Sequence, residues 1–262
     1  MITVAYLQTS PLLGKNSKTL DLTNIMLKGI LHADLIVLPE LANSGYNFIS
    51  KEQAVASAED PSGSSFVEML MKHARRLNAN LVSGFNELAG DGLYNSALLV
   101  NKEGVAGCYR KTHLFMHERD FFLPGNEAPL VYDLGFVKLG MQICFDYMFP
   151  EFWQHMAMQG AQLIAHPSNL VTHYAWKVVP ALALMNRIYV VTANRIGAEN
   201  NLSFRGRSFL AHPDGAVKFK APAKEAVASV FSIDPSIAMD KRVTLLNHVF
   251  NDRRTDLYDQ LL

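Results

Sequence analysis

Two kinds of connection between predicted strands limit the folds open to this chain of 262 residues. Over most of its length, short runs rich in β-branched and aromatic residues alternate with helical patterns, as in strand–helix–strand units. Residues 93–110 differ, because two strands there are joined by the turn at 101–104 with no helix between them. This mixture predicts an α/β fold of two sheets packed face to face and covered by helices. The predicted strands are residues 2–7, 35–38, 81–85, 96–100, 105–109, 140–144, 163–165, 189–193, 208–211 and 227–233.

Four stretches carry helical patterns, at residues 21–31, 65–77, 150–159 and 176–188. The third begins with proline and stops at Gly160, which suits the first turn and the end of a helix. Pro180 lies inside the fourth, where it either kinks the helix or marks its start. Because no repeat or linker is visible, we expect a single domain over residues 1–262, with 236–262 as a C-terminal tail.

The bulk composition argues against several kinds of partner and location. The formal net charge is +0, so there is no electrostatic reason to expect nucleic acid or an anionic membrane as a partner. No window approaches the roughly 18 uncharged apolar residues of a membrane span, and the N-terminus reads as a strand rather than a signal peptide. Two cysteines are too few for a disulfide framework, so we expect a cytoplasmic protein.

Three predicted strands end on reactive side chains. Glu40 follows an apolar run and Pro39, Lys111 follows the hairpin, and Cys144 follows the run at 138–143. Each has an ordinary structural explanation: a surface glutamate, a solvated basic edge beside Arg110, and a buried cysteine. Carboxyl ends of sheet strands are nevertheless where α/β proteins place chemistry. A thiol at a strand-to-helix corner should also favour the thiolate.

Together the three side chains form a coherent chemical set. A carboxylate in a poorly hydrated pocket is a stronger base than in water and can take the thiol proton. A lysine ammonium, with the backbone N–H of Phe145, can stabilise the negative charge on a tetrahedral intermediate. His113 and His166 lie near candidate loops, where we expect supporting or packing roles, and the histidine spacing matches no zinc motif.

The motifs LPE, YRKTHLF, GMQICFDYMFPE and AHPSN, in this order, resemble those of the nitrilase superfamily of carbon-nitrogen hydrolases. The resemblance implies a four-layer αββα sandwich and a Glu-Lys-Cys triad at Glu40, Lys111 and Cys144. It also implies that Glu118, in the loop after the lysine, orients the lysine or positions the substrate. No metal or organic cofactor is implied. One departure is that Met185 precedes Asn-Arg where relatives have glutamate, which predicts that Arg187 lacks its usual partner.

The reaction implied by the resemblance is hydrolysis of a non-peptide carbon-nitrogen bond through a thioester. Because Phe145 and Asp146 follow the nucleophile, a small aliphatic amide is favoured over a nitrile, with an N-carbamoyl amine third. The expected pocket is aromatic and mostly uncharged, and comprises Tyr46, Phe115, Tyr147, Asn169 and Tyr174. A non-catalytic binding or assembly module of the same fold remains the alternative from another class. Relatives pair through helices that correspond to residues 150–159 and 176–188, which implies a homodimer.

Overall fold

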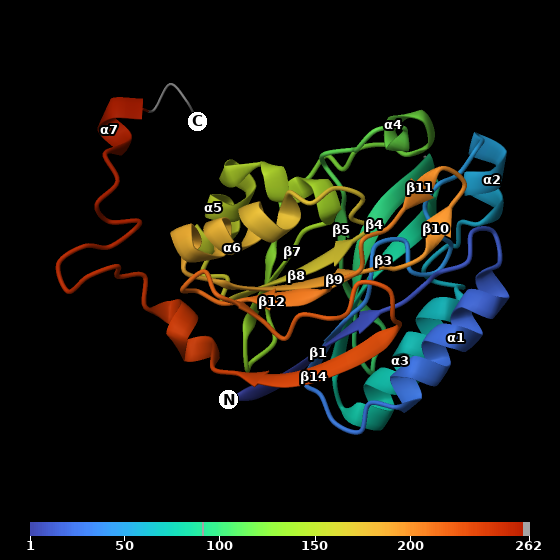
Figure 1. Ribbon diagram of the computed structural model, residues 1–262, viewed down its shortest axis with the longest axis horizontal. Coiled ribbons are helices and arrows are strands. Elements are labelled where there is room, and N and C mark those ends of the chain that lie inside the picture. The colour runs from blue at the N-terminus through green and yellow to red at the C-terminus, as the bar shows by residue number, and fades with distance from the viewer. Residues whose placement is uncertain (91, 259–262) are drawn as a thin grey trace.

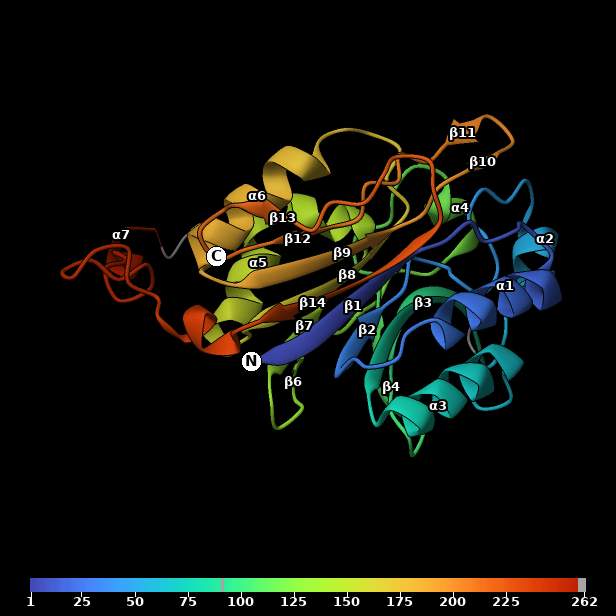
Figure 2. The same ribbon diagram turned by 60° about the horizontal axis from the view of Figure 1, so that its bottom comes forward.

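The computed structural model describes residues 1–90 and 92–258 and contains two six-stranded mixed sheets and one small two-stranded sheet (Figures 1 and 2). The first sheet has the order β14-β1-β2-β3-β4-β5, with bounds β1 Ile2–Gln8, β2 Leu35–Val37, β3 Asn80–Ala89, β4 Gly92–Val100, β5 Val105–Arg110 and β14 Val227–Ile233. The second has the order β13-β12-β9-β8-β7-β6, with bounds β6 Val131–Asp133, β7 Lys138–Met141, β8 Leu163–Ser168, β9 Tyr189–Asn194, β12 Phe209–Ala211 and β13 Val217–Lys218. The small sheet pairs β10 (Ala198–Glu199) with β11 (Leu202–Ser203).

Helices cover the outer face of each large sheet. Figure 1 shows α1 (Asn16–Lys28) and α3 (Ser65–Leu77) on the first sheet, and α5 (Pro150–Met158) and α6 (Ala175–Asn186) on the second. Strands β2 and β3 contact β8 across the gap between the sheets, and buried apolar side chains fill that gap. A second apolar cluster lies under α1 and α3. The predicted αββα sandwich is confirmed.

The helix bounds show which sequence patterns were informative. Helix α3 has the predicted bounds, since Ser64 Oγ accepts a hydrogen bond from the Val67 N–H at 3.1 Å and Asn78 ends the helix with φ +49°. Helix α1 begins and ends earlier than predicted, because its buried positions include Thr19 and Thr23 and only one leucine, Leu27. The apolar pattern from residue 21 therefore placed that helix wrongly.

Differences in the second sheet concern the ends of elements. Strand β7 ends at Met141, so Cys144 lies three residues beyond it and begins a 3₁₀ helix, η1 (Cys144–Met148). Pro180 lies inside α6 and does not start it. Arg187, at the end of α6, donates to the backbone carbonyls of Pro213 at 3.1 Å and Asp240 at 3.4 Å.

Several short elements carry no clear sequence signal, namely α2 (Lys51–Ala56), α4 (Glu118–Phe121), the β10–β11 hairpin, η2 (Pro235–Met239) and α7 (Thr255–Tyr258). In Figures 1 and 2 the tail that carries α7 runs away from the sandwich. Phe250 packs against the core, whereas Leu245 and Leu246 are about nine-tenths exposed. Within the described residues, every helix is too short or too polar to cross a lipid bilayer.

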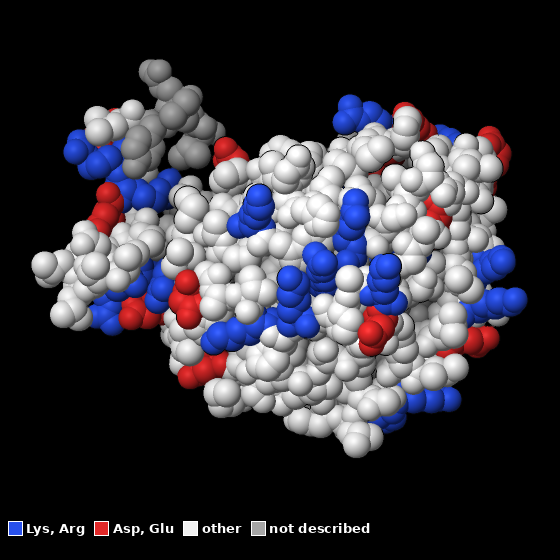
Figure 3. Space-filling view, viewed as in Figure 1, with Lys and Arg blue, Asp and Glu red and all other residues white. Residues whose placement is uncertain are grey.

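The neutral charge balance conceals an uneven surface. Figure 3 shows lysine and arginine side chains gathered along the middle of one face, with acidic side chains beside them and towards the edges. The expectation that the protein has no nucleic-acid partner stays a prediction.

Candidate active site

Carboxyl ends of strands from both large sheets meet at one buried cluster. Strands β2 and β5 run in the same direction, and Glu40 and Lys111 follow them. Cys144 follows β7 in the second sheet, and Asn169 directly follows the neighbouring parallel strand β8. Asn169 Nδ2 donates to the Glu40 carbonyl at 3.0 Å, which ties the two sheets together here.

A lysine between two carboxylates forms the centre of the cluster. Lys111 Nζ donates to Glu40 Oε1 at 2.7 Å and to Glu118 Oε1 at 2.8 Å, and all three side chains are buried. Asn95 Nδ2 also donates to Glu40 Oε1, at 2.7 Å. Within the described residues Glu40 Oε2 has no hydrogen-bond partner. The carboxylate is therefore held through one oxygen, and the other oxygen is chemically able to accept a proton.

The charges in this cluster are set by burial and by mutual contact. Burial works to lower the pKa of Lys111, but Glu118 and Glu40 outweigh it, so the pKa is raised and the lysine is charged. Burial raises the pKa of Glu118 to about 7 against the opposing effect of Lys111. Burial and Glu118 raise the pKa of Tyr46, so its hydroxyl stays protonated. This hydroxyl donates a hydrogen bond to Glu118 Oε1 at 2.7 Å.

Cys144 lies on a tight corner of the backbone. Its φ is +40°, a left-handed conformation that is uncommon outside glycine. Asp146 holds this corner, since its Oδ2 accepts from the Ile143 N–H at 2.9 Å and its N–H donates to the Ile143 carbonyl at 3.0 Å. Tyr109 and His113 also donate to the Asp146 carboxylate, at 2.9 Å and 2.8 Å.

The prediction that Cys144 favours the thiolate is wrong, because its pKa is shifted upward and not downward. Burial and the charge of Glu40 raise the pKa of Cys144 well above its ordinary value, and Lys111 only partly opposes them. The helix that follows is a 3₁₀ helix of five residues, too short to supply a strong dipole. The thiol is therefore protonated at rest and needs a base.

Close backbone contact requires glycine next to Glu40. A Cβ on Gly84 of β3 would lie 2.3 Å from the Glu40 Cα and 2.5 Å from the Pro39 carbonyl oxygen. Without a side chain at this position, β3 can approach the residues after β2, and the Gly84 N–H donates to the Pro39 carbonyl at 3.0 Å. Position 84 thus sets where the Glu40 backbone lies.

We predict that Gly84→Ala lowers the free energy of unfolding by about 1–3 kcal/mol and the turnover by about a hundredfold, because the added methyl displaces Glu40. Urea unfolding and steady-state kinetics measure the two effects. Gly63→Ala is the matched control, since a Cβ there has no atom within 4 Å. Equal behaviour of the two variants would contradict the prediction.

A cavity of about 20 Å³ opens at the thiol. Its lining residues are Phe115, Cys144, Phe145, Tyr147, Asn169, Leu170, Val171 and Thr172. Three of the five pocket residues expected from the sequence, Phe115, Tyr147 and Asn169, are among them. Tyr46 instead lines another cavity, of about 70 Å³, together with Glu118, and Tyr174 is exposed at the start of α6.

A buried cysteine near a paired carboxylate and ammonium is the arrangement implied by the sequence resemblance. Comparison with known proteins shows the family. A family model described as carbon-nitrogen hydrolase matches residues 3–239. The chain belongs to the carbon-nitrogen hydrolases. The resemblance to the nitrilase superfamily is thereby confirmed, and the protein is a cysteine-dependent hydrolase of the nitrilase or amidase type.

Individual relatives of this hydrolase match over nearly the full length. A protein of Pyrococcus abyssi (strain GE5 / Orsay) named nitrilase is 41% identical over 260 residues, which cover 98% of this chain and 99% of the relative. A crystal structure of an amidase from Nesterenkonia sp. is 26% identical with a TM-score of 0.79, covering 100% of this chain and 96% of that one. A variant of the Nesterenkonia sp. AN1 amidase, which shows Michael addition of acrylamide at the active-site cysteine, is 25% identical with a TM-score of 0.80 and full coverage of both chains.

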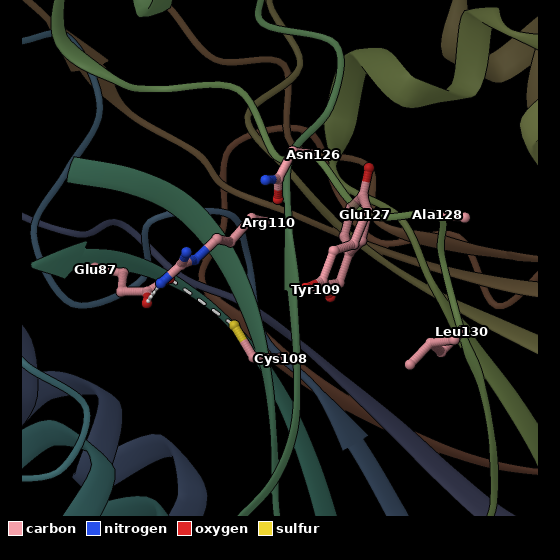
Figure 4. Close-up of a pocket in the computed structure, with 8 residues that line it drawn as sticks. All are labelled: Glu87, Cys108, Tyr109, Arg110, Asn126, Glu127, Ala128 and Leu130. Atoms are coloured by element: carbon pink, nitrogen blue, oxygen red, sulfur yellow. Dashed lines mark hydrogen bonds and ion pairs between the residues drawn. The ribbon is translucent and has the colours of Figure 1, made fainter. Parts of the chain in front are cut away.

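A separate cavity of about 220 Å³ in this hydrolase holds the second cysteine. Its lining residues are Glu87, Cys108, Tyr109, Arg110, Asn126, Glu127, Ala128 and Leu130 (Figure 4). Arg110 donates to both oxygens of Glu87, at 2.6 Å and 3.0 Å, so that carboxylate is already engaged. Burial and Glu87 raise the pKa of Cys108 to about 12, which keeps it a thiol. In this cavity the carboxylate that contacts Cys108 is therefore held by an arginine.

Two functional contacts carried little sequence signal. Asn95 lies in β4 before the apolar run that was predicted as a strand, and its buried amide orients Glu40. Asp146 appeared only as a neighbour of the cysteine, yet it holds the corner on which Cys144 lies. A polar residue inside or beside a buried run was the available clue, since buried polar groups need partners.

Proposed function

We propose that this hydrolase converts small aliphatic amides to carboxylic acids and ammonia, with Cys144 as the nucleophile and Glu40 as the general base. The observation that carries the proposal is the pairing of a buried thiol with a carboxylate whose Oε2 has no partner within the described residues. Lys111 supplies an oxyanion donor, since two of its three ammonium protons contact Glu40 and Glu118 and the third has no hydrogen bond within the described residues.

The first half-reaction forms a thioester. Glu40 Oε2 takes the thiol proton as the sulfur attacks the amide carbon, and the carbonyl electron pair moves onto oxygen. Lys111 and the Phe145 N–H hold that oxyanion. When it collapses the carbon–nitrogen bond breaks, and Glu40 returns the proton to the departing nitrogen, which leaves as ammonia.

The second half-reaction restores the enzyme. Glu40 takes a proton from water, the hydroxide attacks the thioester carbon, and the same donors hold the second oxyanion. The carbon–sulfur bond then breaks, Glu40 returns its proton to Cys144, and the carboxylic acid is released. Glu118 acts on this sequence by fixing Lys111, to which it is bonded at 2.8 Å.

The lining of the pocket supports the choice of substrate. The cavity at the thiol has mainly aromatic and aliphatic walls, which favour an uncharged acyl group. Similarity to the amidase from Nesterenkonia sp. supports an amide as the substrate of this chain. Similarity to the Pyrococcus abyssi protein named nitrilase supports a nitrile as the second candidate. N-carbamoyl amines remain third.

We predict that ammonia release from a panel of short amides and the matching nitriles is fastest with the amides. Cys144→Ser should lower the turnover roughly 10⁴-fold or more, because it replaces the nucleophile. Cys108→Ser is the matched control and should keep parental turnover, since Cys108 lies in the other cavity. Turnover of nitriles but not amides would reverse the order of substrates. Full activity of a Cys144→Ala variant would instead favour a non-catalytic role for the cluster.

The predicted homodimer is part of the proposal. Apolar side chains of α5 and α6 are exposed on the monomer, among them Met158 at 59% and Met185 at 62%. Apolar residues that lie bare on a monomer suit burial against a second copy. The cytoplasmic location expected from the two cysteines stays a prediction.

A further inference from the structure

The carbonyl of the nucleophile residue has a specific partner in the core. His166 Nε2 lies 3.0 Å from the Cys144 carbonyl oxygen, and Nδ1 lies 3.0 Å from Thr192 Oγ1. Because a carbonyl oxygen only accepts, Nε2 must carry the proton. Burial lowers the pKa of His166 to about 4, so the ring is neutral near pH 7, and Nδ1 then accepts from the threonine hydroxyl. The imidazole is thus fixed in one tautomer between two partners.

This hydrogen bond fixes the direction of a second group. The carbonyl of Cys144 and the N–H of Phe145 belong to one peptide plane, and the described residues contain no cis peptide bond. In a trans peptide these two groups point in opposite directions. The carbonyl is held towards the core by His166, so the N–H is turned away from the core, towards the side where Cys144 and Phe145 line the cavity.

The peptides on the two sides of Cys144 have different anchors. Asp146 holds the preceding peptide through the Ile143 backbone, whereas His166 holds the following one. A left-handed residue with φ +40° costs backbone energy and persists only where its surroundings fix it. Loss of Asp146 would therefore move the thiol, and loss of His166 would release the plane that carries the Phe145 N–H.

We propose that His166 is a positioning residue that aims the Phe145 N–H at the oxyanion. This proposal rests on the function proposed above and adds a residue to it. His166 touches neither the substrate nor the sulfur in this scheme. Its effect should therefore be confined to steps that build an oxyanion, and should be absent from reactions of the thiol that involve no carbonyl.

The test compares two reactions of Cys144 in a Cys108→Ser background. The first is acylation by p-nitrophenyl acetate, which passes through an oxyanion and is followed by the p-nitrophenolate burst and by the mass of the protein. The second is reaction with methyl methanethiosulfonate. There the thiolate attacks sulfur, methanesulfinate leaves, and a mixed disulfide forms with no oxyanion. Amide hydrolysis is measured in parallel to separate kcat from KM.

We expect His166→Leu to lower the acylation rate and the kcat for amides by about 10²- to 10³-fold, the loss seen when one oxyanion donor is removed. KM and the methyl methanethiosulfonate rate should stay within about threefold of parent, by the same argument. His166→Gln keeps an N–H donor at the same end of the side chain and should recover most of the loss. His73→Leu is the control for general destabilisation. It also removes a buried imidazole, but one that lies in α3, on the other sheet.

Three results would overturn the proposal: an unchanged acylation rate in folded His166→Leu, an equal fall in both thiol reactions, or a His166→Gln variant as slow as His166→Leu. Retained acylation by the ester in a parent protein that hydrolyses no amide would count against the amide assignment and not against His166. The two failures are thereby distinguishable.

Discussion

Glu40→Gln is expected to lower the kcat for amides about 10⁴-fold, because it removes the carboxylate that we propose as the base, whose Oε2 has no hydrogen-bond partner within the described residues. The same change should lower the pKa of Cys144. The negative charge of Glu40 is one of the causes that raise that pKa, and its removal leaves Lys111 to favour the thiolate. The rate of reaction with methyl methanethiosulfonate at pH 7 should therefore rise while the turnover collapses. The pH dependence of that reaction should shift to lower pH.

Glu118→Gln separates the two proposed roles of Glu40, namely general base and negative charge that raises the pKa of Cys144. It removes another charge that raises the pKa of Cys144 but leaves the general base intact. We expect a similar, smaller downward shift in the thiol titration, with a much smaller loss of turnover than in Glu40→Gln. If Glu40→Gln kept more than about a tenth of parental kcat, the assignment of the base would be wrong, given the usual size of this effect.

Lys111→Met should be the most destabilising single change in the site. It removes the cation between Glu40 and Glu118 and leaves two buried carboxylates facing each other. Loss of one partner of a buried ion pair costs about 3–5 kcal/mol of folding free energy. Turnover should also be lost, because the ammonium is the oxyanion donor that we propose. Urea unfolding and steady-state kinetics measure the two losses.

The direction in which pH changes the folding free energy of Lys111→Met follows from Glu118. Its pKa is already raised by burial to about 7 although Lys111 lowers it, so loss of Lys111 must raise it further. A carboxyl group with a raised pKa in the folded state holds its proton more tightly folded than unfolded. Its contribution to stability is therefore present below the ordinary pKa and is lost as the pH rises through the folded pKa. The deficit of Lys111→Met should be larger at pH 8 than at pH 5.

A double variant provides the control. Lys111→Met with Glu118→Gln leaves one buried carboxylate instead of two. It should recover part of the folding free energy and flatten the pH dependence, but it should not recover turnover. A single variant with the same deficit at pH 5 and pH 8 would contradict this account of the cluster.

The sequence was informative where a signal is local. Strand-like runs that lead to a reactive side chain pointed to Glu40, Lys111 and Cys144, because such a run can be recognised in consecutive residues. The catalytic roles of these residues stay a prediction. Helix α3 was also predicted with its bounds, since Ser64 and the apolar face are both visible in the chain. The sandwich could be expected from the mixture of crossovers and hairpins.

Properties that depend on distant residues could not be predicted in this way. The pKa of Cys144 depends on Glu40 and Glu118, which approach it only in the fold. The bond from Asn95 to Glu40 joins residues 55 positions apart. Helix α1 was misplaced because two of its buried positions are threonines, Thr19 and Thr23, and the Thr19 hydroxyl accepts from the Leu12 N–H at 2.9 Å, a contact that forms only in the fold. These properties arise from contacts between residues that are distant in the chain, so no short stretch of sequence reveals them.

The division of the reacting groups between two sheets has a mechanical consequence. The first sheet contributes Glu40 and Lys111, and the second contributes the sulfur, so the proton-transfer distance depends on the spacing of the layers. Enlarging or trimming an aliphatic residue in the inter-sheet core, such as Val82, should alter that spacing with no change to any group that meets substrate. The rate of the chemical step would then report changes in the spacing between the two sheets. Hydrostatic pressure, which compresses such gaps, should act on the same step.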